Sequence, residues 1–176
     1  METLTDRAAV EAVALRAFAL MREGTLADFE ALIHPEAVNH EEKDEPPASR
    51  GRGPRPFHAT AVWLREAFAD LDWDIHTTVV EGDLAVVHCT MTGRHVDTFV
   101  AFDAEARVAD AFPPTGKRFA VTQTHWMRVA GGRLVEHWAN RDDLGMAMQL
   151  GWAPPSPVYL LRMALAKRRA VRRYSR

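Results

Sequence analysis

The chain has 176 residues, of which 47% are hydrophobic and 26% charged, with a formal net charge of −2. This is the composition of an ordinary globular protein of one domain. The single cysteine, Cys89, excludes an internal disulfide, and no hydrophobic run approaches the roughly 20 residues of a membrane span. The N-terminus has no signal-peptide pattern, so we expect a cytoplasmic protein in a reducing compartment.

The charge is distributed unevenly. Seven of the 22 Lys and Arg residues lie in the segment 162–176, which has no acidic residue; the remainder holds 15 basic and 24 acidic residues, a net charge of −9. The basic segment lacks interleaved aromatic residues and a strong apolar face. We therefore interpret it as a solvated helix end and expect neither nucleic acid nor a membrane as partner.

Three helices are expected in the N-terminal third. Asp6 can cap the first helix, which Gly24 ends. Thr25 and Asp28 form a capping box for a short second helix, which should end at His34-Pro35 because proline disfavours a helical residue before it. The third covers roughly residues 57–69 and follows a polar loop.

That loop, residues 39–56, has almost no apolar side chain. A loop of this length inside a compact domain is usually a functional lid or disordered, and we expect a lid over a pocket.

From residue 73 the patterns are those of strands, followed by two helices. The expected strands cover residues 73–80, 84–96, 98–102, 106–112 and a hairpin from 119 with Gly131-Gly132 at its turn. The helices cover residues 143–150 and the segment after Pro157. This order predicts an α+β domain over residues 1–153, in which a curved antiparallel sheet and three N-terminal helices enclose a pocket, and a basic helical tail over residues 154–176.

The register of the hairpin decides which residues share the pocket face. With a two-residue loop His125 lies opposite Trp138, whereas a bulge at Gly132 shifts the pairing so that His125 shares a face with His137 and Ala139. The pattern leaves both registers open.

Several side chains could carry chemistry. His125 is a candidate base, with a satisfied core histidine as the alternative. Asp142 is a candidate proton-transfer partner, although an acid in front of Leu144 is also a good helix cap. Cys89 is expected to be a buried strand residue. The histidines lack zinc-site spacing, so no metal is expected.

Short motifs along residues 5–152 resemble the SnoaL-like polyketide cyclase (ester cyclase) family, which has the NTF2-like cone fold. The matching strings are His34-Pro35 with Asn39-His40, Gly93-Arg94-His95, Pro114-Thr115-Gly116-Lys117, the run Gly131 to Trp138, Asp142 to Gly145, and Gln149-Leu150-Gly151. The segment 101–111 looks like an insertion relative to shorter members.

The resemblance implies aldol-type ring closure by acid/base chemistry on a small hydrophobic carbonyl substrate, without a cofactor. The family's histidine falls at His125, but its catalytic aspartate falls at Ala139, and alanine cannot move protons. The alternative is therefore a non-catalytic small-molecule-binding protein. A steroid-isomerase-like site would need a pocket tyrosine, and the only tyrosines are Tyr159 and Tyr174 in the tail.

The pocket is expected to hold a small hydrophobic ligand. The expected ligand contacts are Asn39, His40, Trp63, Phe68, His95, Phe99, Met127 and His137. A homodimer is expected through the opposite face of the sheet, where Thr122, Thr124, Trp126 and Arg128 alternate with the pocket residues.

Overall fold

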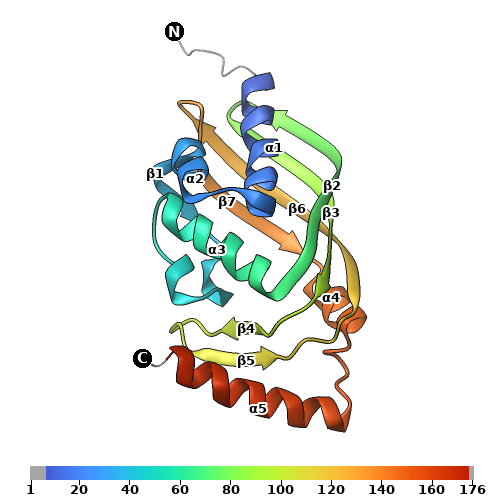
Figure 1. The fold of residues 1–176 in the computed structure, drawn as a ribbon. Coiled ribbons are helices and arrows are strands. Elements are labelled where there is room, and N and C mark those ends of the chain that lie inside the picture. The colour runs from blue at the N-terminus through green and yellow to red at the C-terminus, as the bar shows by residue number, and fades with distance from the viewer. Residues whose placement is uncertain (1–6, 175–176) are drawn as a thin grey trace.

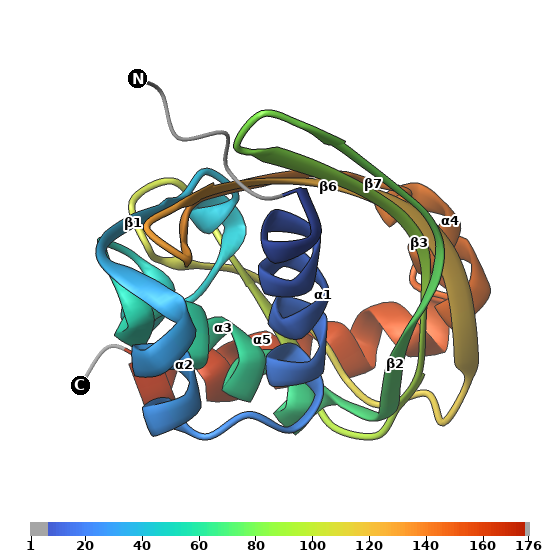
Figure 2. The same ribbon diagram turned by 90° about the horizontal axis from the view of Figure 1, so that it is seen from above.

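The computed structural model describes residues 7–174, and the predicted N-cap Asp6 lies outside this range. Three helices, α1 (Arg7–Glu23), α2 (Leu26–Leu32) and α3 (Pro54–Ala67), lie against the concave face of a curved sheet (Figures 1 and 2). The capping box predicted for α2 is present, since the Thr25 and Asp28 side chains each bond the other's backbone N–H. The predicted α+β architecture is confirmed.

The main sheet has five strands in the order β1-β7-β6-β3-β2. Their bounds are β1 (Ile33–Asn39), β2 (Phe68–Glu81), β3 (Leu84–His95), β6 (Arg118–Ala130) and β7 (Arg133–Arg141). All pairs are antiparallel except β1 with β7. Alternate residues of β6 are buried because successive side chains of a strand point to opposite faces.

Strand β1 was not predicted. The second helix was expected to end at His34-Pro35. Instead, α2 ends at Leu32, and the chain continues as a strand parallel to β7. Pro35 is tolerated because β1 is an edge strand, where a missing N–H need not break a ladder. This strand places Asn39 beside His137.

The hairpin register is settled by a bulge. Ala130 pairs with Arg133 across the Gly131-Gly132 turn and Val129 with Leu134, but Arg128 pairs with Glu136. The extra residue is therefore Val135, three residues after Gly132. His125 consequently lies opposite Ala139, and His137 points to the same face of the sheet as His125.

The remaining elements lie at one end of the sheet. The strands β4 (Phe99–Phe102) and β5 (Val108–Phe112) form a separate two-stranded sheet, and α4 (Asp143–Leu150) follows β7. Helix α5 (Pro157–Tyr174) packs along β5 (Figure 1).

The basic tail is only partly a solvated helix. It buries Tyr159, Ala166 and Ala170, and the Tyr159 hydroxyl donates to the Pro113 carbonyl at 2.9 Å. Leu160, Leu161 and Leu165 remain exposed. Within residues 7–174, no helix has the length and apolar character needed to cross a bilayer.

Candidate active site

A cavity of about 240 Å³ lies between the concave face of the sheet and helices α1 to α3. Its walls are mostly apolar side chains, which come chiefly from these helices and also from several strands. Polar groups enter from β6, from β7 and from the loop after β1, which includes the short turns at Glu42–Asp44 and Pro47–Ser49. This polar loop was predicted to be a lid, and Asn39, Glu41, Asp44 and Glu45 do line the cavity.

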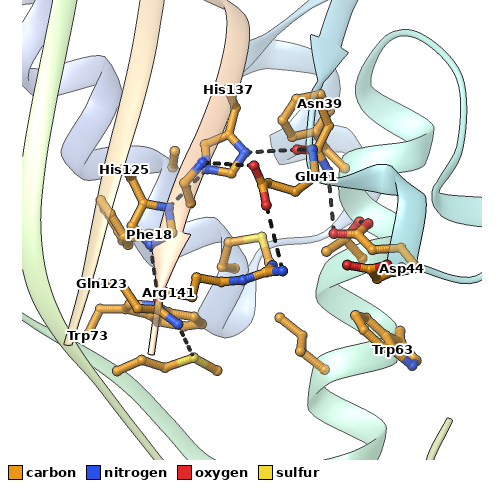
Figure 3. Close-up of a pocket in the computed structure, with 18 of the residues that line it drawn as sticks. Phe18, Asn39, Glu41, Asp44, Trp63, Trp73, Gln123, His125, His137 and Arg141 are labelled. Atoms are coloured by element: carbon orange, nitrogen blue, oxygen red, sulfur yellow. Dashed lines mark hydrogen bonds and ion pairs between the residues drawn. The ribbon is translucent and has the colours of Figure 1, made fainter. Parts of the chain in front are cut away.

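A chain of hydrogen bonds runs along one wall (Figure 3). His125 Nε2 lies 2.9 Å from Gln123 Oε1, and His125 Nδ1 lies 2.9 Å from His137 Nε2. His137 Nδ1 in turn lies 2.9 Å from Asn39 Oδ1. The two imidazole rings are stacked with centroids 5.2 Å apart. Strand alternation places Gln123 and His125 on this face, and the Val135 bulge brings His137 to it.

The hydrogen-bond chain ends on both sides at an amide oxygen whose orientation is fixed. Gln123 Oε1 accepts from the Trp73 indole N–H at 3.2 Å, and Asn39 Oδ1 accepts from the Glu41 backbone N–H at 3.2 Å. The indole N–H and the backbone N–H can only donate hydrogen bonds. Neither side-chain amide can therefore exchange the positions of its oxygen and its nitrogen without losing the bond. The three contacts along the chain therefore need three protons, and two neutral imidazoles supply only two.

Burial determines the charge of the histidine pair. Desolvation, followed by the neighbouring positive charge of Arg141, lowers the pKa of His137 to about 4. Burial is also the largest cause that holds the pKa of His125 well below its usual value. Both rings are therefore neutral near pH 7, which is the form of histidine that accepts a proton.

Two carboxylates from the loop complete the site. Glu45 is buried, shares a hydrogen bond with Thr60 Oγ1 and accepts from Asn39 Nδ2, and burial raises its pKa to about 7. Glu41 accepts the Ala139 backbone N–H at 3.1 Å and forms an ion pair with Arg141 at 3.6 Å. Within residues 7–174, no three His, Cys, Asp or Glu side chains are grouped as a metal ion would require.

The sequence model of the SnoaL-like polyketide cyclase family matches residues 11–150. The chain belongs to this family. Aklanonic acid methyl ester cyclase DnrD from Streptomyces peucetius is 30% identical over 138 residues, which cover 76% of this chain and 85% of the relative. Nogalonic acid methyl ester cyclase from Streptomyces nogalater is 28% identical over 133 residues, covering 73% and 87% of the two chains.

Solved structures agree with this assignment. The structure of TsrD from Streptomyces laurentii superimposes with a TM-score of 0.66 at 28% identity, covering 83% of this chain and 97% of that one. The fold of this SnoaL-like chain is thus shared with proteins of similar length, and its curated relatives are polyketide cyclases.

The structure brings six of the predicted site residues of this SnoaL-like chain to the cavity. They are Asn39, Trp63, Phe99, His125, Met127 and His137. Phe68 and His95 do not line it. They are fully buried beside it, in an aromatic cluster with Phe99 and Trp152. His40 is exposed and packs edge-on against Trp138.

Asp142 was a candidate proton-transfer partner of His125, with a helix cap as the alternative, and the structure places it as the cap. Its side chain accepts the Gly145 backbone N–H at 2.8 Å, which makes it the N-cap of α4. Asp142 is exposed and is not among the lining residues. The chain turns out of the strand after Arg141, so the carboxylate points along the new helix and not into the pocket.

Several polar lining residues of this SnoaL-like chain were missed, among them Gln123, Arg141, Glu41 and Glu45. Gln123 had a signal, because it lies two residues before His125 and so shares its face. Arg141 is likewise two residues beyond Ala139. No sequence signal marks Glu41 and Glu45, because a polar loop without periodicity does not reveal which side chains turn inward.

Proposed function

We propose that this protein closes a ring in a small polyketide ester by intramolecular aldol condensation, without a cofactor and with His125 as the base. The observation that carries the proposal is the proton count along the histidine chain. Two protons can occupy these three contacts in three ways, and the proposal takes the tautomers in which His137 donates from Nδ1 to Asn39 and accepts at Nε2 from His125 Nδ1–H. His125 Nε2 then holds a lone pair with no proton facing it.

The same arrangement favours uptake of one proton. When His125 Nε2 gains a proton, it can donate to Gln123 Oε1, and all three contacts along the chain become hydrogen bonds. This gain offsets part of the cost of placing a charge in a buried site. A base whose protonated form is better bonded than its neutral form is suited to abstract an acidic C–H proton.

The reaction then proceeds in two steps. The substrate C–H group takes the place of Gln123 Oε1 at His125 Nε2, which then accepts a proton from the carbon between two carbonyl groups and leaves an enolate. The enolate carbon attacks a second carbonyl carbon of the same molecule; a C–C bond forms, the C=O π bond breaks and an alkoxide results. The alkoxide takes the proton back from His125, so the enzyme is regenerated and the product is a cyclic alcohol.

The size and lining of the cavity fit this class of substrate. A volume of about 240 Å³ is small for a ligand pocket, so it suits a small-molecule substrate. The mostly apolar walls suit the hydrocarbon part of such an ester and keep water from the enolate.

The alternative is a protein that binds the same ligand without turnover. Ala139 favours this alternative, because the residue directly opposite His125 offers no acid. The two functions differ in whether bound ester is converted.

The test is turnover of an open-chain polyketide methyl ester, beginning with aklanonic acid methyl ester. We expect His125→Ala to lower turnover on the order of 10²-fold or more, in keeping with general-base contributions. The control is His88→Ala on the outer face, where His88 bonds Thr124, and it should leave turnover unchanged.

A gain-of-function variant separates the two functions further. Ala139→Asp should raise turnover if this is a cyclase that lacks one acid. If neither the parent nor this variant converts any such ester while both bind it, the cyclase proposal fails and the binding protein is the better description.

A further inference from the structure

We propose that Arg141 is the group that binds the two oxygens of a 1,3-dicarbonyl substrate and stabilises its enolate. This inference rests on the proposed function and names the substrate class of the same site. It begins from an asymmetry in the cavity: four acidic side chains line it, and Arg141 is the only Lys or Arg among the described lining residues.

The guanidinium of Arg141 has unused hydrogen-bonding capacity. Its contacts within residues 7–174 are two ion pairs, at 3.6 Å to Glu41 and 3.5 Å to Asp143, both beyond ordinary N–H···O distances. No described residue accepts a hydrogen bond from its side-chain N–H groups. In contrast, the half-buried Arg65 donates to the backbone carbonyls of Leu20, Met21 and Gly24.

The position of Arg141 is set from two sides. It is the last residue of β7, two residues beyond Ala139, so its side chain leaves the strand on the cavity face. Glu41 is itself anchored by the Ala139 backbone N–H, and with Asp143 it holds the guanidinium in place. Figure 3 shows the side chain extending toward the centre of the cavity, with Glu41 above it.

The small side chain at position 139 leaves this space open. Ala139, directly opposite His125 and two residues before Arg141, adds only a methyl group to this wall. A ligand can therefore contact His125 and Arg141 at once. That arrangement places the base next to the C–H group and the cation next to the carbonyl oxygens.

The chemistry of the guanidinium selects the ligand. Its N–H groups form a planar fork that matches two oxygens held side by side, as in a carboxylate. The enolate of a 1,3-dicarbonyl compound presents the same pair of oxygens and carries the negative charge that the neutral ketone lacks. A fixed cation in a site with little water stabilises that charge more than it stabilises the neutral ground state.

The test is binding of a stable enolate, which requires no turnover. The probe is 2-acetylcyclohexane-1,3-dione, a triketone that is an enolate anion at neutral pH. Acetylcyclohexane serves as the uncharged control ligand. Binding can be followed by tryptophan fluorescence, because Trp63, Trp73 and Trp152 line the cavity.

We expect Arg141→Met to weaken binding of the triketone by about tenfold or more and to leave acetylcyclohexane unaffected. Arg141→Lys keeps the charge but loses the fork, so its dissociation constant should lie between those of the parent and Arg141→Met. The matched control is Arg133→Met on the same strand, which should bind like the parent. If Arg141→Met does not fold, as judged by circular dichroism, the dissociation constant of Arg141→Lys is compared with that of the parent instead.

Two results would overturn the inference: a parent that does not bind the triketone, or Arg141 variants whose affinity lies within twofold of the parent. Neither depends on ring closure. Triketone binding that requires Arg141 in a protein without cyclase turnover supports the oxygen-binding site and refutes the proposed function. Cyclase turnover that is insensitive to Arg141→Met supports the function and refutes the site.

Discussion

At the scale of single residues, the hydrogen bonds around Glu45 assign its protonation state. Thr60 Oγ1 contacts both Glu45 Oε2 and the Pro56 carbonyl, the latter at 3.2 Å, but it carries one proton. If Glu45 is ionised, one of these contacts lacks a hydrogen. If Glu45 is protonated, it donates to Thr60 and Thr60 donates to Pro56. The raised pKa of about 7 means that the neutral acid predominates below pH 7.

This assignment predicts a pH-dependent stability. The pKa of Glu45 rises from 4.5 to about 7 on folding. Its contribution to the free energy of unfolding is therefore fully present below pH 4.5 and is lost as the pH rises through 7. The loss is on the order of 3 kcal/mol between these limits. Glu45→Gln keeps every bond, because its amide can donate to Thr60 and its oxygen can accept from Asn39.

Thermal unfolding of the parent and of Glu45→Gln at pH 5 and pH 8 checks this prediction. The melting temperature of the variant should exceed that of the parent at pH 8 and match it at pH 5. Equal melting temperatures at both values would show that Glu45 is an ionised, well-compensated carboxylate. Comparing the two proteins cancels the contribution of the histidine pair, which titrates in both.

At the scale of elements, helix α4 depends on its N-cap. Asp142 accepts the Gly145 backbone N–H, and a side chain at position 145 would collide with the Asp142 carboxylate, since its Cβ would lie 2.1 Å from Oδ2. The Asp142 cap therefore requires a glycine at position 145. Helix α4 in turn covers β6, where the Gln149 amide bonds both backbone groups of Ala120.

We expect Asp142→Ala to lower the free energy of unfolding by about 1 kcal/mol, the usual value of an N-cap, and to leave turnover intact. Asp142→Asn should behave like the parent, because asparagine caps equally well. Chemical denaturation and the ester assay measure the two effects. Loss of turnover at unchanged stability would instead support the proton-transfer role first considered for Asp142.

At the scale of the whole molecule, the outer face of the sheet carries a row of aromatic and polar side chains. Trp126 and Trp138 stack in parallel there with centroids 6.4 Å apart, and His88 bonds Thr124 beside them. This face lies opposite the cavity, so covering it would not block the ligand. It remains the surface on which we predict a homodimer.

Sedimentation should therefore show a dimer at micromolar concentration, and Trp126→Glu should convert it to a monomer, because a buried unpaired carboxylate is costly at an interface. Glu36→Gln on the exposed part of β1 is a control that should remain dimeric. A parent that sediments as a monomer would contradict the prediction.

The basic helix α5 makes a second prediction at this scale. A chain ending at Pro155 retains every strand of the main sheet and every residue of the cavity, so we expect it to fold. It loses the packing of Ala166 and Ala170 on the β4–β5 sheet and of Tyr159 on the main core, and its melting temperature should fall. Circular dichroism and triketone binding measure the two outcomes. An unfolded product would show that the small sheet requires α5.

The sequence by itself determined the features that depend on short-range geometry. Strand alternation placed His125 and Met127 on one face, the Thr25 capping box opened α2, and Gly131-Gly132 marked the turn. Each depends on residues a few positions apart, whose relative placement is set by backbone geometry. The tertiary structure decided the rest.

Asn39 and His137, which bond each other in the site, are 98 positions apart, and no local pattern links them. The Val135 bulge and the parallel pairing of β1 exist because they improve burial across the whole sheet, where contributions from many strands outweigh local preference. The same long-range packing turned Glu41 and Glu45 inward.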